Sequence, residues 1–187
     1  DEDGVFRNGI FSYGGIHDYR YTWPLIYRPL VSADSWTIEA TKILLGQDVL
    51  CEQFCSIQFS TAIPYFYGPQ EKVTQAHRLL QLDTERMDTQ APVMNCKAVY
   101  PLLTIQFGEH QLEWKLSDFW EKVSTVSTEL CSYLAQKMER IHVTCKLGIR
   151  TSSSGPGWIL GHRMMFNLFT VFDSRWSRMG IAKASRP

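Results

Sequence analysis

Cysteine and histidine side chains can ligate metals or act as nucleophile and base, and the chain has five of each. Cys51 and Cys55 lack a second Cys or His pair at zinc-binding spacing. His142 and Cys145 lie three residues apart on a predicted strand, so their side chains point to opposite faces. The spacing therefore predicts no metal site, and buried, reduced cysteines are the better interpretation.

A nucleophilic Cys–His pair assembled in space stays an open alternative, because distant residues can meet in a fold. No cysteine carries a flank that is typical of a catalytic nucleophile. We therefore expect no enzyme, no catalytic residue and no cofactor. An enzyme with a spatially assembled Cys/His site is the less favoured alternative.

The segment from Ser152 to Gly157 is rich in Ser and Gly, the residue types that line phosphate-binding loops. It lacks the Gly-Lys-Ser/Thr ending of a P-loop and opens no predicted helix. One interpretation is a flexible hairpin loop. The other is an anion site, because Arg150 and Arg163 flank the segment with positive charge.

The charge of the chain is divided along its length although its net charge is zero. Residues 1–139 carry 11 Lys and Arg against 18 Asp and Glu, a net charge of −7, whereas residues 140–187 carry 8 against one, a net charge of +7. A solvated surface that balances the acidic part is one explanation, and a surface for an anionic membrane or RNA is the other. The candidate anion-binding residues are Lys146, Arg150, Arg163, Arg175, Arg178, Lys183 and Arg186.

The composition is that of a globular protein with one core, at 187 residues, 44% hydrophobic and 20% charged. The odd cysteine count and the absence of Asn-x-Ser/Thr sites favour a reducing, cytoplasmic compartment. The longest apolar run, residues 164–172, is too short for a membrane-spanning helix. Because the first residue is not Met, we expect a processed or trimmed fragment.

Hydrophobic periodicity predicts an α+β fold with antiparallel sheets in a single domain. Residues 36–45 and 53–63 alternate like strands, and residues 103–116 read as a hairpin around Gly108. Two main helices are expected, at about 70–82 after Pro69 and at about 117–140, where apolar residues recur every three or four positions. Further strands are expected at 141–149 and from Trp158 onward, and 164–172 fits either a buried strand or a short helix.

The domain organisation expected is an extended aromatic and proline-rich arm at 1–35, a globular domain at 36–172 and a basic tail at 173–187. Such an arm either packs along its own domain or docks on a neighbouring subunit. The candidate self-association residues are Tyr19, Tyr21, Trp23, Leu25 and Trp158.

The stretch from Leu147 to Leu160, LGIRTSSSGPGWIL, resembles the end of vesiculovirus-type rhabdovirus matrix proteins. Those proteins have a Gly-Leu/Ile strand, a short Lys/Ser/Gly loop and a returning strand that begins with Trp. The resemblance covers about 15 of the 187 residues, and the basic N-terminal region and Pro-Pro-x-Tyr motif of that family are absent. It implies a non-enzymatic α+β protein that self-associates, coats the inner membrane leaflet and binds the nucleocapsid.

The sequence thus predicts a viral matrix-like structural protein. Its expected partners are further copies of itself, an anionic lipid surface, a ribonucleoprotein and a host or viral protein of unknown identity. Its expected location is the cytoplasm, the inner membrane face or the virion. A cytosolic interaction module, such as an adaptor or host-factor antagonist, is the alternative, with the 103–116 hairpin or the arm as its docking surface.

Overall fold

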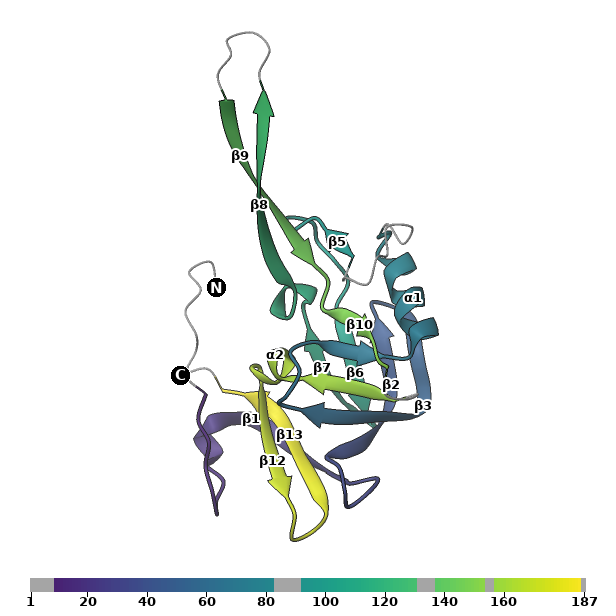
Figure 1. Cartoon of the computed structure of the whole chain (residues 1–187). Coiled ribbons are helices and arrows are strands. Elements are labelled where there is room, and N and C mark those ends of the chain that lie inside the picture. Colours follow the sequence, from purple (N-terminus) through teal and green to yellow (C-terminus); the bar gives the residue numbers. More distant parts are fainter. Residues whose placement is uncertain (1–8, 83–91, 131–136, 154–156, 186–187) are drawn as a thin grey trace.

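A seven-stranded mixed sheet forms the centre of the computed structural model, which describes residues 9–82, 92–130, 137–153 and 157–185. The strand order is β10-β4-β11-β3-β2-β6-β7 (Figure 1). The strands are β2 (Thr37–Leu45), β3 (Asp48–Ser60), β4 (Phe66–Gly68), β6 (Leu103–Phe107), β7 (His110–Trp114), β10 (Ile149–Thr151) and β11 (Trp158–Gly161). The largely alternating burial of β2 confirms the strand at 36–45, and the antiparallel pairing of β6 with β7 confirms the hairpin at 103–116.

Segments from the two ends of the described chain form a second sheet of three antiparallel strands. Strand β13 (Arg178–Ala184) lies between β1 (Tyr21–Pro29) and β12 (Leu168–Asp173), at the lower end of Figure 1. Strand β1 lies within the predicted arm and β13 within the predicted tail, and the two pair from Tyr21 with Ala184 to Pro29 with Arg178. The division into arm, domain and tail stays a prediction.

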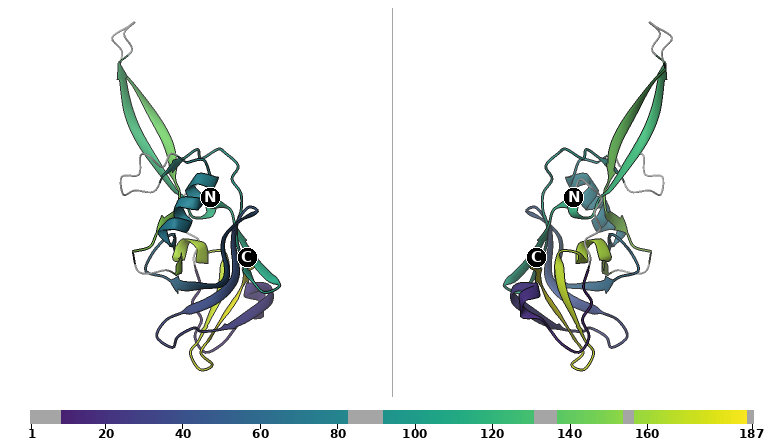
Figure 2. Two further views of the ribbon diagram at one scale, coloured as in Figure 1. Left: turned by 90° about the vertical axis from the view of Figure 1, so that its right-hand side faces the viewer. Right: turned by 90° about the vertical axis from the view of Figure 1, so that its left-hand side faces the viewer.

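A long antiparallel hairpin of β8 (Glu121–Leu130) and β9 (Lys137–Lys146) projects from the body of the protein (Figures 1 and 2). At its base β9 also pairs with the short strand β5 (Val93–Met94). The predicted helix at 117–140 is therefore wrong. The run from Val123 to Thr128 consists of Val, Ser and Thr, which are poor helix formers, and the pairing of β8 with β9 outweighs the helical spacing of its apolar residues.

Helices are few among the described residues. The helix expected at 70–82 is confirmed as α1 (Gln70–Leu79), which begins after Pro69 and buries Val73 and Ala76. The others are one turn each: η1 (Asp18–Arg20), η2 (Leu116–Asp118) and α2 (His162–Met165). Together α2 and β12 resolve the ambiguity at 164–172, since both a short helix and a strand occur there.

The architecture is a single, mostly β domain, so the α+β class holds only loosely. One buried cluster runs from β2 and β3 through the hairpin to α1 and β11. The rings of Phe66 and Trp158 stack at 4.9 Å within it, and the indole of Trp114 donates a hydrogen bond to the Met164 carbonyl. This core fixes the neighbouring ends of β3, β4 and β11.

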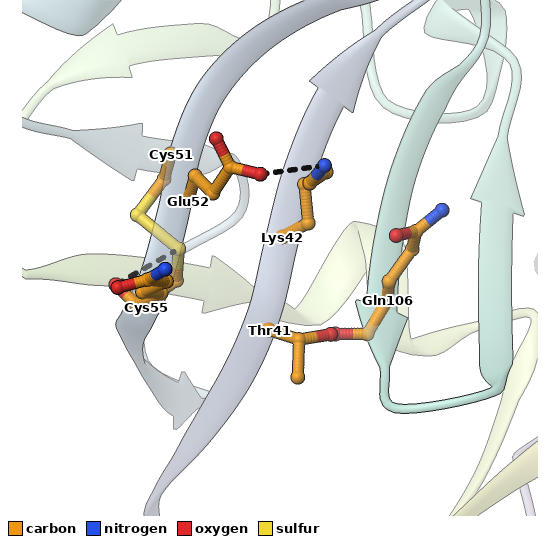
Figure 3. Close-up of a disulfide and its surroundings, with 7 residues drawn as sticks. Thr41, Lys42, Cys51, Glu52, Cys55 and Gln106 are labelled. Atoms are coloured by element: carbon orange, nitrogen blue, oxygen red, sulfur yellow. Dashed lines mark hydrogen bonds and ion pairs between the residues drawn. A yellow bond between two sulfur atoms is a disulfide. The ribbon is translucent and has the colours of Figure 1, made fainter.

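Four cysteines form disulfides, so the expectation of reduced cysteines is wrong for Cys51–Cys55 and Cys96–Cys145. Two residues four apart on a regular strand are about 13 Å apart, which is too far for a disulfide. Gln53 and Phe54 adopt positive φ angles of 61° and 52°, and the resulting bulge brings the Cα atoms of Cys51 and Cys55 to 6.0 Å. Figure 3 shows this bond beside the 2.7 Å ion pair of Lys42 and Glu52. Cys131 lies outside the described residues.

No helix within the described ranges is long and apolar enough to cross a membrane.

Candidate functional site

The carboxyl ends of two parallel strands meet at the centre of the main sheet. Strands β3 and β11 pair in parallel from Ile57 with Trp158 to Ser60 with Gly161. In open α/β sheets, ligands bind outside the carboxyl ends of parallel strands, and we apply the same reasoning to this parallel pair in a mixed sheet. The topology therefore places a candidate site where Ser60 and Thr61 face His162, which we call the strand-end site.

The loop between β3 and β4, residues 61–65, is held by backbone hydrogen bonds from the other strand end. The amide of Gly161 donates to the Tyr65 carbonyl at 3.0 Å, and the amide of His162 donates to the Ile63 carbonyl at 2.8 Å. A Cβ atom on Gly161 would lie 2.4 Å from the Tyr65 oxygen, so only glycine allows this approach. On the Thr61 side, the side-chain Nδ1 of His162 lies 3.2 Å from the Thr61 carbonyl oxygen.

A cluster of aromatic and charged side chains supports the end of this loop. Tyr65 is buried, and its hydroxyl donates a 2.7 Å hydrogen bond to Oε2 of Glu121, the first residue of β8. The guanidinium carbons of Arg150 and Arg163 lie 3.6 Å and 5.0 Å from the centre of the Tyr65 ring. We call these four residues the Tyr65 cluster.

The electrostatics of the Tyr65 cluster keep its carboxylate ionised. The hydrogen bond from Tyr65 holds the pKa of Glu121 below its usual value, and the charges of Arg150, Arg163 and Lys146 lower it further. Burial raises the pKa of Tyr65, and the hydrogen bond to Glu121 adds to that effect. The cluster therefore contains a neutral phenol and an ionised carboxylate at neutral pH.

The structure divides the predicted anion-binding residues between two regions. Lys146, Arg150 and Arg163 lie at or beside the Tyr65 cluster. The others that are described, Arg175, Arg178 and Lys183, belong to the β12–β13 sheet, and Arg186 lies outside the described residues. The basic quarter of the sequence is therefore not one continuous feature of the fold.

The predicted self-association residues also have different environments. Tyr19 and Trp23 are each 69% exposed, and Leu25 is half-buried. In contrast, Tyr21 and Trp158 are buried, Tyr21 donating a hydrogen bond to Asp18 and Trp158 stacking on Phe66. The last two side chains thus stabilise this domain itself.

Metal and thiol chemistry find no support in the part of the chain that the structure describes. No group of three or more His, Cys, Asp or Glu residues that could hold a metal ion occurs there. The disulfides also occupy the four described cysteines, including Cys145 of the His142–Cys145 pair. The spatially assembled Cys/His site is therefore not formed by these four cysteines.

Comparison with known proteins identifies the family. The family model described as eukaryotic aspartyl protease matches residues 6–184, which is nearly the whole chain. The chain belongs to the eukaryotic aspartyl protease family. The proteins below are its relatives within that family.

Several curated relatives match this chain along most of its length. Pregnancy-associated glycoprotein 4 of Ovis aries is 27% identical over 179 residues, which is 95% of this chain and 43% of the relative. Renin of Rattus norvegicus is 26% identical over 91% of this chain and 40% of its own length. Cathepsin D of Rattus norvegicus is 23% identical over 95% of this chain and 41% of its own length. The chain thus spans about two fifths of the curated relatives it matches.

Family membership corrects the function predicted from the sequence. The likeness to rhabdovirus matrix proteins is wrong, and so are the expectations of a non-enzymatic protein and of self-assembly, membrane or ribonucleoprotein partners. The alternative of a cytosolic interaction module finds no support either. Within the misleading stretch, 147–160, the described residues include strands β10 and β11, which lie on either side of β4 and do not pair with each other.

Aspartic proteases work with two aspartates that lie close enough to share one proton. The aspartates that the structure describes lie on separate turns or at element ends, and none of them is buried: Asp18, Asp34, Asp48, Asp118 and Asp173. At the strand-end site, the Ser60 hydroxyl instead accepts a 3.3 Å hydrogen bond from the Ala62 amide, Thr61 is exposed, and the His162 imidazole lies at the Thr61 carbonyl. Within the described ranges, no aspartate pair stands at these strand ends.

Sequence reasoning missed Ser60, Thr61, Tyr65 and Glu121. The first two were placed inside a strand predicted at 53–63, and Glu121 inside the helix predicted at 117–140. A usable signal was present, because Pro64 and Gly68-Pro69 mark the end of a strand and the start of a helix. The parallel pairing with 158–161 had no local signal.

Proposed function

We propose that this chain is part of an aspartyl protease that binds an extended peptide across the strand-end site. The observation that carries the proposal is the family match over residues 6–184, which includes β3, β11 and the loop between β3 and β4. The exposure of Thr61 and Ala62 at the carboxyl end of β3 supports a peptide-binding role, because exposed loop groups can bond to a peptide backbone.

Hydrolysis requires one carboxylate to act as a base toward water and a protonated partner to act as an acid toward the peptide. Because the described residues offer no aspartate pair, we assign at least one of the two carboxyl groups to sequence that the structure does not describe. In this arrangement Ser60 and Thr61 bind or orient the peptide and the attacking water. Activity is then a property of the complete gene product.

The test is cleavage of a peptide library by the complete gene product and by the 187-residue chain, followed by mass spectrometry between pH 3 and pH 7. We expect cleavage by the complete product with an acidic optimum and none by the chain alone. Folded complete product that binds peptides yet cleaves none at any pH would overturn the proposal.

A gain-of-function variant sharpens this test. Ser60→Asp places a carboxyl group at the end of β3, where Ser60 is half-buried beside Gly161. If the site lacks a carboxylate, this substitution raises the cleavage rate of the complete product at acidic pH. Thr61→Asp is the matched control, since Thr61 is exposed and lies beyond the strand pairing.

We further propose that the protein folds in an oxidising compartment, because the two disulfides persist only where thiols are not kept reduced. The cytoplasmic location expected from the cysteine count stays a prediction, and the disulfides count against it. Thiol labelling of protein taken directly from its native source separates the two: unlabelled Cys51, Cys55, Cys96 and Cys145 support oxidation, and full labelling contradicts it.

A further inference from the structure

The Tyr65 cluster holds more positive than negative charge beside the strand-end site. Arg150, Arg163 and Lys146 all act electrostatically on Glu121, which is the carboxylate in the cluster. The two guanidinium groups beside the Tyr65 ring, those of Arg150 and Arg163, outnumber the single ionised carboxylate of Glu121 and leave a surplus of positive charge among these residues. This surplus lies where the loop from the strand-end site ends, at Tyr65.

Arg150 has bonding capacity that the cluster does not use. Its Nη2 lies 3.4 Å from Glu121 Oε2, longer than the 2.7–2.9 Å of a strong charge-assisted hydrogen bond. Its buried Nε has no hydrogen-bond partner. Stacking on the Tyr65 ring at 3.6 Å fixes the guanidinium plane, and its side chain remains 27% exposed. The buried Nε is out of reach of a ligand, but a fixed, partly exposed guanidinium that is held only loosely by Glu121 is suited to a second carboxylate at its exposed end.

Arg163 lies in α2, directly after the carboxyl end of β11, and is fixed by two hydrogen bonds. Its Nη1 donates a 2.8 Å hydrogen bond to the Trp120 carbonyl, and its backbone amide donates to the Pro64 carbonyl at 3.2 Å. Neither acceptor carries a full negative charge, so the positive charge of Arg163 is not neutralised by its own hydrogen bonds. The Tyr65 ring thus holds two cations in place at the end of the 61–65 loop.

We propose that Arg150 and Arg163 bind an acidic side chain of a peptide that occupies the strand-end site, so that the protein prefers peptides with Glu or Asp at that position. The inference rests on the proposed peptide-binding function and adds its substrate class. Planar guanidinium groups match a carboxylate with two parallel hydrogen bonds, which an amide of the same shape cannot reproduce. Because the cations are partly exposed, the preference falls as salt increases.

The experiment measures binding rather than cleavage, so it succeeds or fails independently of the proposed protease activity. The probe is a pair of fluorescent eight-residue peptide pools, randomised except for one central Glu in the first and Gln in the second. Binding to the 187-residue chain is followed by anisotropy at pH 6 and low salt. We expect the Glu pool to bind about tenfold more tightly, which corresponds to about 1.4 kcal/mol.

Variants assign the preference to the cluster. Arg150→Gln and Arg163→Gln should each remove most of the Glu preference, whereas Glu121→Gln should increase it by removing the competing carboxylate. Arg175→Gln is the matched control, because Arg175 is an exposed cation in the distant β12–β13 turn. Arg150→Lys retains the charge but lacks the planar guanidinium, and it replaces Arg150→Gln in this test if that variant does not fold.

The outcomes separate the two proposals. Equal binding of the Glu and Gln pools, or a Glu preference that survives in both folded arginine variants, overturns the acidic-side-chain inference even if the complete product cleaves peptides. A Glu preference lost in the arginine variants supports it, even if the complete product cleaves nothing.

Discussion

Two arginine-rich regions of this protein look alike in sequence but differ in how their charges are used. In the Tyr65 cluster, Arg150 pairs with Glu121 at 3.4 Å, whereas Arg163 donates to the Trp120 carbonyl, and both lie beside the buried Tyr65 ring. In the β12–β13 hairpin, Arg178 bonds to Asp173 at 2.7 Å and lies 4.1 Å from the centre of the Tyr27 ring.

The two regions differ in how their positive charge is neutralised and in which part of the fold the arginines contact. In the hairpin, Asp173 neutralises Arg178 in a one-to-one ion pair, and the exposed Arg175 lies over the Trp176 ring, in a turn that carries no candidate site. The Tyr65 cluster has a surplus of cations and is fastened to the loop of the strand-end site. A basic stretch of sequence therefore becomes a binding feature only where the fold leaves its charge unbalanced beside a site.

The largest loss of stability is expected from an alanine substitution at Gly161, compared with the same substitution at Gly180 in the other region. Gly161→Ala would place a Cβ atom 2.4–2.7 Å from backbone atoms of the 61–65 loop, which cannot move without breaking the loop. We expect a loss of about 3 kcal/mol or more in the free energy of unfolding, measured by urea denaturation. Gly180→Ala in β13 meets the Tyr27 and Val171 side chains at 2.9 Å or more, and should cost about 1–2 kcal/mol.

Gly157→Ala is the control for this comparison, since its nearest contact would be 3.6 Å away. A loss for Gly161→Ala no larger than that for Gly180→Ala would show that the loop is not held as rigidly as its hydrogen bonds indicate.

Removing a phenol hydroxyl tests whether the cluster is a connected unit. Tyr65→Phe deletes the 2.7 Å hydrogen bond to Glu121 while keeping the ring between the two arginines. We expect a loss of about 1 kcal/mol in the free energy of unfolding, because Tyr65 is buried and its hydrogen bond is to a charged group. Tyr27→Phe, the corresponding change beside Arg178, should alter stability by less than about 0.5 kcal/mol. Similar losses for both variants would contradict the distinction between the regions.

The two carboxylates should respond separately to pH. Arg178 holds the pKa of Asp173 below its usual value through its hydrogen bond, as Tyr65 does for Glu121. A carboxyl group with a lower pKa in the folded state stabilises the fold above its unfolded pKa, and this stability is lost as pH falls through the folded value. Carboxyl-carbon NMR titration should show that Tyr65→Phe raises the pKa of Glu121 only, and that Arg178→Gln raises the pKa of Asp173 only.

The smallest effect is expected at the hairpin ion pair. Arg178→Gln should change the free energy of unfolding by less than about 1 kcal/mol, because exposed ion pairs contribute little, and the change should shrink in high salt. Thermal denaturation at 50 mM and 500 mM NaCl measures this dependence. A loss larger than that of Tyr65→Phe would reverse the ranking of the two regions.

The elements of the fold that could be predicted from the sequence are those encoded by a pattern of neighbouring residues. The alternation in 36–45 and 103–116 predicted strands correctly, and Pro69 with the stripe of Val73 and Ala76 predicted α1. The helix predicted at 117–140 failed because three- and four-residue apolar spacing does not exclude a strand of Val, Ser and Thr. The prediction of reduced cysteines was wrong for Cys51 and Cys55, because only the bulge at Gln53 and Phe54 brings the two residues together.

The sequence by itself determined those strands and that helix whose hydrophobic periodicity or turn residues are compatible with one type of element. It also determined which side chains carry charge. The tertiary structure alone decided that β3 and β11 lie in parallel, and that Tyr65, Glu121, Arg150 and Arg163 meet from four separate elements or loops. Pairing between distant segments depends on the burial of the whole core, and no short stretch of residues contains that information. For this reason the positive charge was visible in the sequence, while the place where it stays unbalanced was not.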